Sequence, residues 1–312
     1  MNGINEESTA ISLMDREMEN FQSYSCEAMA TSFQFHLAGV SKGLVDSAAM
    51  EAEELLVGLE SQLSLYIEHS DTSRINRALE GEEIAVSQVM VDCLLEAFDA
   101  SSRLAGVFDP FLGQLAIDAK GQRPILPHLK GIEASETAIE GPVISLDPDA
   151  NRVRKLRYGP LLDLGGIGKG FALDRLCDLL QHWDIDSGLL NSGGSTFLAL
   201  NANAEGRKWT LNIGYGTNLC PIELAPGYSI ASSGELFQES HIINPADGPR
   251  FDWKRSYAIS RTAALADAAS TAGLLLGEIE VESICQEEGD LSFALFSENS
   301  ARFFGPFFKE DS

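Results

Sequence analysis

Hydrophobic positions early in the chain change their spacing from that of a strand to that of a helix. In MATSFQFHLAG, residues 29–39, Phe33, Phe35 and Leu37 alternate with polar residues, which is the period of a half-buried strand. Over residues 41–66, leucines recur at helical spacing, with acidic residues on the opposite side. The pattern therefore predicts a strand that leads into a long amphipathic helix.

Later segments continue this mixture of periods. Residues 87–106 form a second helical pattern that Ser87 would cap and Gly106 would end. Two β-prone runs around the turn sequence DPDAN predict a hairpin within residues 141–156. Residues 118–142 are rich in proline and glycine, so we expect an irregular insertion there.

The remaining periodic segments follow no strict strand-helix-strand order. They predict helices over 166–183 and 262–277, strands within 187–200 and over 208–213, and a closing pair of strands over 291–297 and 301–307. This order favours an α+β fold with a mixed sheet over a doubly wound parallel one. Residues 1–24 lack such a pattern, which predicts a flexible tail before one globular domain over residues 25–312.

Composition and charge narrow the range of functions. The chain has 312 residues, 44% of them hydrophobic, which is enough for one large core or two modest ones. Lys and Arg number 22 against 47 Asp and Glu, a formal net charge of -25 that repels phosphates and anionic lipid headgroups. We therefore expect no nucleic-acid partner and no membrane-surface role. No apolar run reaches the roughly 18 residues of a membrane span and no export signal is recognisable, which predicts a soluble, cytoplasmic protein.

The cysteines indicate reduced thiols. Their number is odd and no C-x-x-C pair occurs, so neither a disulfide framework nor a structural zinc site is supported. No spacing links a cysteine to a histidine, which argues against a catalytic thiol. The five are Cys26, Cys93, Cys177, Cys220 and Cys285.

A glycine-rich segment, LDLGGIGKGFALD over residues 162–174, stands directly before a predicted helix. Unpaired amides and the positive helix end would suit a phosphate there. A Walker A loop is excluded because Asp163 stands where its first glycine would be and Gly170 follows Lys169. The G-x-G-x-x-G pattern fails at Phe171. A tight turn whose glycines need positive φ is an equally weighted alternative.

Two oxygen-bearing side chains share one face of an alanine-rich helix, LADAASTAG over residues 265–273. Asp267 and Thr271 are four residues apart, so their side chains lie one above the other. Oxygen ligands suit a hard cation such as Mg²⁺, which often bridges to substrate phosphates. The alternative is a hydrogen bond between the two residues within the helix.

Two further segments carry candidate binding residues. In GVFDPFLG, residues 106–113, Phe108 beside Asp109 could hold a planar heterocycle, although an Asp-Pro turn explains the same residues. In ESHIINPADG, residues 239–248, His241 stands at the edge of an apolar step before a turn. A lone histidine of this kind is more often structural than catalytic.

Taken together and in order, seven segments resemble the ApbE family, the FAD:protein FMN transferases. They are AMATSF, LSLYIEHSDTSRIN, GVFDPFLG, LDLGGIGKGFALD, LLNSGGS, SGE with SHIINPADG, and TAALADAASTAG, and they span residues 27–277. The resemblance implies an enzyme that cleaves the pyrophosphate of FAD with Mg²⁺, moves FMN onto a Thr or Ser hydroxyl of a partner flavoprotein and releases AMP. It also implies a two-lobed, T-fold-like α+β architecture with FAD in the central cleft.

Carried over by position, the resemblance assigns roles to individual residues. Mg²⁺ would be held by the side chains of Asp267 and Thr271 and by the main-chain carbonyl of Gly168. His241 would act as general base toward the acceptor hydroxyl, and the catalytic residues would be His241 and Asp267. The expected FAD contacts are Met29, Tyr66, Phe108, Asp109, Gly165, Phe171 and Ile243.

Departures from the family pattern lie mostly on the acceptor side. Gly168 stands in place of the usual alanine, Ser195 in place of an acid, and Asn244 in place of a frequent Asp.

Two other functions would use the same residues. An FAD pyrophosphatase would replace the acceptor hydroxyl with water and yield FMN and AMP, and a non-catalytic module would bind FAD without turnover.

Overall fold

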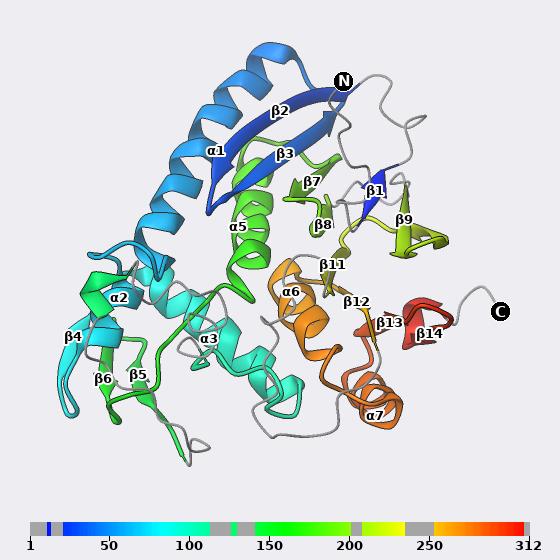
Figure 1. Cartoon of the computed structure of the whole chain (residues 1–312). Helices are drawn as coiled ribbons and strands as arrows, with labels where there is room; N and C mark the ends of the chain where they lie inside the picture. The colour runs from blue at the N-terminus through cyan, green and yellow to red at the C-terminus, as the bar shows by residue number, and fades with distance from the viewer. Residues whose placement is uncertain are drawn as a thin grey trace, which may run out of the picture.

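The computed structural model describes residues 11–13, 21–112, 126–129, 141–200, 208–234 and 253–308. Within them the chain forms three sheets and a set of helices (Figure 1), which confirms the predicted α+β class.

The elements follow one another without a repeating unit. The strands are β1 (Ser12–Leu13), β2 (Phe21–Ala28), β3 (Thr31–Ala38), β4 (Glu83–Ala85), β5 (Ile144–Asp147), β6 (Arg152–Lys155), β7 (Gly188–Ser192), β8 (Thr196–Ala199), β9 (Trp209–Tyr215), β10 (Asn218–Leu224), β11 (Ser229–Gly234), β12 (Arg255–Ser260), β13 (Ser292–Phe296) and β14 (Ala301–Phe304). The α-helices are α1 (Lys42–Leu63), α2 (Asp71–Arg77), α3 (Gln88–Arg103), α5 (Gly168–His182), α6 (Ala263–Ala272) and α7 (Glu278–Glu288). Short 3-10 turns cover Pro127–Leu129 and Pro306–Phe308.

The largest sheet has eight strands in the order β14-β13-β12-β11-β8-β7-β3-β2. Smaller sheets have the orders β1-β9-β10 and β4-β6-β5, and the latter contains the predicted hairpin. All pairings between the described strands are antiparallel, apart from one isolated parallel bridge between Leu112 and Leu161. The sheet expected to be mixed is therefore antiparallel among the described strands. Several neighbouring strands are joined by short turns, which permit only antiparallel pairing.

Two of these turns lie at the same end of the strands of the large sheet. Met29 and Ala30 join β2 to β3 with φ of 52° and 57°, as a two-residue hairpin with two positive φ angles requires. Gly193 and Gly194, with φ of 60° and 67°, begin the turn between β7 and β8. A Cβ on Gly193 would overlap the hydroxyl of Thr31, so glycine is needed for space as well as for conformation.

The central strands of the large sheet are buried on both faces. Leu190 and Leu198 belong to the core beneath the helices, whereas their neighbours Leu189 and Phe197 belong to a second core shared with β9. Helices α1, α5 and α6 cover the first face, and the β1-β9-β10 sheet packs against the second (Figure 1). The residues of β7, β8, β12 and β13 are therefore buried at every position rather than at alternate ones, and in β12 they include Arg255 and serines.

The amino-terminal segment differs in part from the expected tail over residues 1–24. Strand β1 pairs with β9, strand β2 begins at Phe21, and Ile11 is buried in the second core. The Phe21 ring lies 5.0 Å from that of Trp209 between centroids. These contacts join sequence-distant strands, so the local pattern did not reveal them. The domain over residues 25–312 otherwise remains a prediction.

Helix α3 begins and ends as its sequence predicts. The hydroxyl of Ser87 accepts a hydrogen bond from the Met90 amide at 3.2 Å. After Arg103, Gly106 adopts φ of 75° and its amide donates to the carbonyl of Ser101 at 2.8 Å.

The five cysteines are free thiols, as expected, and three of them are buried. No helix in the described part of the chain is both long and apolar enough to cross a membrane.

Candidate active site

The glycine-rich turn, which we define as residues 162–168, is held on one side by α2. The side chain of Asn76, buried in α2, donates to the carbonyl of Leu162 at 2.9 Å and accepts from its amide at 2.7 Å. The next amide, that of Asp163, donates to the carbonyl of Pro110 at 2.8 Å. The side chain of Asn76 thus bonds both main-chain groups of Leu162, as a neighbouring strand would. These hydrogen bonds fix the segment that leads into α5.

Two glycines of this turn, and Gly170 just after it, lie close to neighbouring elements. The expected tight turn is present, but none of Gly165, Gly166, Gly168 and Gly170 has a positive φ, so the need for that conformation is the part of the alternative that is wrong. A Cβ on Gly170 would overlap the carbonyl of Ala263 in α6. A Cβ on Gly166 would lie only 3.2 Å from the Phe108 ring. Neighbouring elements therefore approach the main chain closely, as a ligand would also need to do.

Helix α5 begins at Gly168 without a side-chain cap. Its N-cap residue, Ile167, offers no hydrogen-bond acceptor in its side chain. The first amides of a helix have no partner within it and carry the positive end of its dipole. One of them, that of Gly170, donates to the carboxylate of Asp267 at 3.2 Å. The start of α5 is therefore electropositive and faces α6.

Asp267 projects from α6 toward this end of α5 and is only 3% exposed. Besides the Gly170 amide, its carboxylate contacts the ammonium of Lys169 at 3.3 Å and the hydroxyl of Thr196 at 3.4 Å. These distances exceed the roughly 2.7–2.9 Å of strong charge-assisted hydrogen bonds. The carboxylate is thus buried and only loosely paired, which suits it to bind a cation.

Thr271 lies one turn further along α6. Its hydroxyl lies 3.2 Å from that of Ser233 in β11 and donates to the main-chain carbonyl of Asp267 at 3.4 Å. A Cβ on Gly166 would lie 3.9 Å from the same hydroxyl. The hydrogen bond within the helix therefore runs to the backbone, while the hydroxyl itself faces the glycine-rich turn.

Phe108 and Asp109 border the same turn. Phe108 is buried against Gly166, and Asp109 accepts a hydrogen bond from the Phe111 amide at 2.8 Å. Burial raises the pKa of the Asp109 carboxyl above its ordinary value, and the amide partially offsets this rise. The Asp-Pro turn is therefore present, and it also places the aromatic ring beside the glycine-rich turn.

The β2-β3 hairpin also reaches the glycine-rich turn, through Met29. The terminal methyl carbon of Met29 lies 3.3 Å from where a Cβ on Gly168 would be. Tyr66, which follows α1, is 47% exposed. Phe171 differs from both because its ring is fully buried, with the guanidinium of Arg175 at 5.2 Å, so only its main chain could meet a ligand. His241 and Ile243 lie outside the described residues.

Four contacting residues were not predicted. Asn76 ends the quoted segment LSLYIEHSDTSRIN, and Thr196 follows NSGGS, so both stood beside recognised motifs. Lys169 stands out in the sequence only as the lysine of the excluded Walker A pattern. Ser233 carried no signal beyond the short SGE motif, because its contact with α6 arises only when β11 packs beneath that helix.

The donor set fits a hard cation better than a soft one. Across the described residues, no three His, Cys, Asp or Glu side chains gather into a metal-binding group. A cation here would depend on the Asp267 carboxylate, the Thr271 hydroxyl, main-chain carbonyls and water. Mg²⁺ commonly binds in this manner, with one or two carboxylates and several waters.

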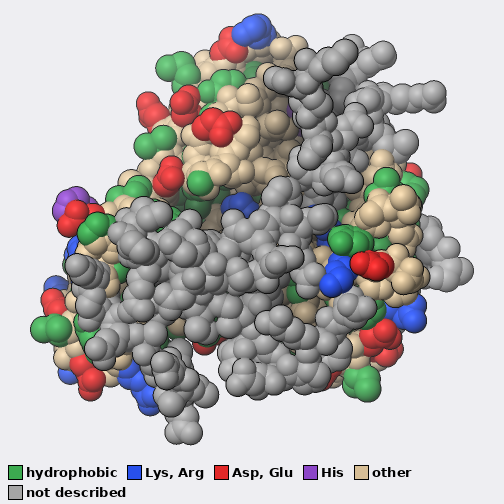
Figure 2. Space-filling model, viewed as in Figure 1, with side chains coloured by type: hydrophobic (Ala, Val, Ile, Leu, Met, Phe, Trp, Pro, Cys, Tyr) green, Lys and Arg blue, Asp and Glu red, His purple; other side chains and the backbone are tan. Residues whose placement is uncertain are grey.

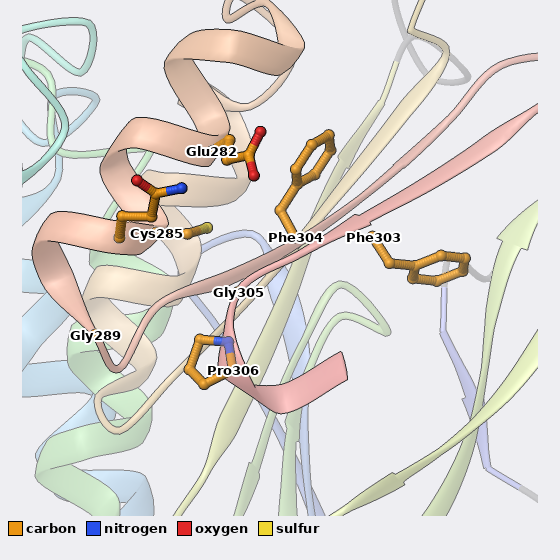
Figure 3. Close-up of a pocket in the computed structure, with 8 residues that line it drawn as sticks. Glu282, Cys285, Gly289, Phe303, Phe304, Gly305 and Pro306 are labelled. Atoms are coloured by element: carbon orange, nitrogen blue, oxygen red, sulfur yellow. The ribbon is translucent and has the colours of Figure 1, made fainter. Parts of the chain in front are cut away.

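A separate pocket of about 220 Å³ lies between α7 and β14 (Figure 3). Phe304 points toward α7 and Glu282, whereas Phe303 points to the other side of the strand. None of the predicted site residues lines this pocket. It is therefore distinct from the site at the start of α5.

Acidic side chains are spread over the face seen in Figure 2, including the region of α1. Exposed carboxylates on this helix include Asp46, Glu51, Glu53 and Glu54. Lys42 is the basic residue of this helix, so acidic residues outnumber basic ones along α1.

Comparisons with known proteins identify the family of this chain. The family model described as "ApbE family" matches residues 29–295. The FAD:protein FMN transferase of Vibrio cholerae is 26% identical over 76% of this chain and 76% of its own length. That of Klebsiella pneumoniae is 23% identical over 84% and 81%.

Solved structures show the same fold. The flavin transferase ApbE from Vibrio cholerae superposes with a TM-score of 0.71 at 19% identity, covering 93% of this chain and 99% of that one. The ApbE protein of Thermotoga maritima gives a TM-score of 0.73 at 19% identity, covering 93% and 98%. Because the family model matches most of its length, this chain belongs to the ApbE family.

Proposed function

We propose that this chain is an FAD:protein FMN transferase, which moves FMN from FAD onto a Thr or Ser hydroxyl of a partner flavoprotein and releases AMP. One observation carries the proposal. The uncapped start of α5, the loosely paired carboxylate of Asp267, the hydroxyl of Thr271 and the ring of Phe108 converge on one glycine-rich turn. The names of the curated relatives support the same activity.

In this proposal FAD lies in the central cleft with its pyrophosphate at the glycine-rich turn. The amides at the start of α5 would bind phosphate oxygens, and Phe108 would contact a planar ring. The other proposed FAD contacts are Met29, Tyr66, Asp109, Gly165, Phe171 through its main chain, and Ile243.

Mg²⁺ is the cation that we propose for the site. The side chains of Asp267 and Thr271 and the carbonyl of Gly168 would hold it. When bound, it would supply positive charge to the pyrophosphate and to the leaving AMP. The ammonium of Lys169, 3.3 Å from Asp267, adds a second positive charge beside the same carboxylate.

The proposed transfer requires one general base, which accepts the proton of the acceptor hydroxyl. The acceptor oxygen attacks the phosphorus of the FMN half, a new oxygen-phosphorus bond forms, and the pyrophosphate bridge breaks to release AMP. His241 would take the proton of the hydroxyl, because an imidazole titrates near neutral pH. This role is carried by the family motif alone, since His241 lies outside the described residues.

The decisive experiment incubates the purified protein with FAD, Mg²⁺ and an acceptor domain that the Vibrio cholerae relative modifies. AMP is quantified by chromatography, and covalent flavin is measured by fluorescence of the denatured acceptor. The matched control is the same acceptor with its target Thr or Ser replaced by Ala. We expect one covalent flavin per AMP released, and none on the control.

The alternatives predict different products. AMP and free FMN without covalent flavin would instead identify an FAD pyrophosphatase. Intact FAD after prolonged incubation with Mg²⁺ would identify a binding module. Either result would contradict the proposed transferase.

A further inference from the structure

Helices α5 and α6 each bind amides of the other helix's first turn through a carboxylate. Asp174 of α5 accepts hydrogen bonds from the amides of Ala263 and Ala264, both at 2.8 Å. In the reverse direction, Asp267 of α6 accepts from the amide of Gly170 at 3.2 Å. The two helices are thereby joined at both amino-terminal turns.

The first turn of α6 depends on Asp174 because its own cap is weak. The N-cap hydroxyl of Thr262 accepts from the Leu265 amide at 3.4 Å, which is long for a hydrogen bond. The first amides of a helix lack partners within it, and a carboxylate near them is favoured by the helix dipole. Asp174 thus holds α6 one turn before Asp267.

Close main-chain contact reinforces this connection. A Cβ on Gly170 would overlap the carbonyl of Ala263, so the backbones of α5 and α6 touch without an intervening side chain. Three contacts therefore set the position of α6 along α5, at Asp174, at Gly170 and at Asp267. Sliding or rotating α6 would move Asp267 and Thr271 away from the glycine-rich turn.

The side chain of Asp174 makes no other hydrogen bond among the described residues. It borders a cavity of about 250 Å³ that Glu96, Arg175, Asp178 and Arg261 also line. Burial raises the pKa of the Asp174 carboxyl to about 6, while the two α6 amides and Arg175 act in the opposite direction. Burial therefore disfavours the charged form of Asp174, and both hydrogen bonds of its side chain are with amides of α6.

We propose that Asp174 is a positioning residue, which places Asp267 and Thr271 for cation binding by holding the first turn of α6 against α5. This inference rests on the proposed function for the identity of the cation site. Asp174 itself would touch neither the cation nor FAD.

The test measures Mn²⁺ affinity directly, from the electron paramagnetic resonance signal of free Mn²⁺, in the presence of FAD and without an acceptor. The variants are Asp174→Ala and Asp174→Asn. Asp178→Asn is the matched control, because it removes the same charge one turn along α5 from an exposed residue whose ion pair is with Arg175. Circular dichroism at the assay temperature verifies that each variant is folded.

We expect Asp174→Ala to weaken Mn²⁺ binding about tenfold, because a shift of α6 would displace Asp267 and Thr271 together, and loss of even one outer-shell partner of a metal ligand typically costs about tenfold or more. Asp174→Asn should weaken it less, because the amide oxygen can still accept one of the two hydrogen bonds. Asp178→Asn should leave Mn²⁺ affinity within about twofold of that of the unmodified protein, because an exposed ion pair contributes little. If Asp174→Ala fails to fold, the isosteric Asp174→Asn decides the question alone.

Folded Asp174 variants that bind Mn²⁺ as tightly as Asp178→Asn would overturn the inference and leave the transferase proposal intact. Conversely, weakened Mn²⁺ binding in a protein that transfers no FMN would support the positioning role and refute the proposed function. An unmodified protein that binds no Mn²⁺ would overturn both.

Discussion

Lys155 is a buried cation whose removal should stabilise the protein. It lies on β6 and is fully buried, and its ammonium donates one hydrogen bond, to the carbonyl of Pro160 at 3.2 Å. Within the described residues no carboxylate contacts it. Burial lowers the pKa of the Lys155 ammonium from 10.5 to about 8.

This pKa shift sets the size of the expected effect. At about 1.4 kcal/mol per pKa unit, the buried charge costs about 3 kcal/mol at neutral pH. Lys155→Met keeps the length of the side chain and removes the charge, but it leaves the Pro160 carbonyl unpaired at a cost of about 1 kcal/mol. We therefore expect the free energy of unfolding to rise by about 2 kcal/mol at pH 7.

The effect should also depend on pH in a defined direction. Below pH 8 both the folded and the unfolded protein carry the Lys155 proton, so the full cost is present. Between pH 8 and 10.5 the unfolded chain holds a proton that the folded chain has lost, so the unmodified protein gains stability as pH rises. The advantage of Lys155→Met should therefore shrink over this interval.

Urea unfolding monitored by tryptophan fluorescence at pH 7 and pH 10 measures both quantities. Lys42→Met is the control, because Lys42 is exposed on α1 and pairs only with Asp46 at the surface. If Lys155→Met lowered stability at pH 7, or if its effect were equal at both pH values, the ammonium would not be an uncompensated buried charge and the reasoning would be refuted.

Three further substitutions test the site. Gly170→Ala should destabilise the protein by about 2 kcal/mol in urea unfolding, because its Cβ would overlap the Ala263 carbonyl. Gly58→Ala, which meets nothing within 4 Å in the middle of α1, should instead be neutral or stabilising, and equal effects would contradict the close contact. Asp267→Ala should abolish Mg²⁺-dependent AMP release in a folded protein, and unchanged release would remove the metal assignment. His241→Ala should slow transfer to an acceptor more than it weakens FAD binding in a fluorescence titration, and equal losses would indicate a structural role.

Several elements with one exposed and one buried side could be predicted from the sequence, although β2 and β10, which share that pattern, were missed. Helices α1 and α3 and the β5-β6 hairpin follow from local periodicity and turn residues, because that spacing determines which side chains face a core. Strand β12 is buried throughout and has no alternation, so it was missed. Helix α2 was missed because its buried residues, such as Asp71 and Asn76, are mostly polar.

The amino-acid sequence by itself determined the family motifs, which depend on residue type and order. It also determined that Asp267 and Thr271 share one face of a helix, because they are four residues apart. Only the tertiary structure decided that Asn76 holds the glycine-rich turn and that Asp174 holds α6, across separations of 86 and 89 residues. The same packing showed that the glycines provide space rather than positive φ. Local spacing specifies which face of an element is buried, but what meets that face depends on how distant elements pack together.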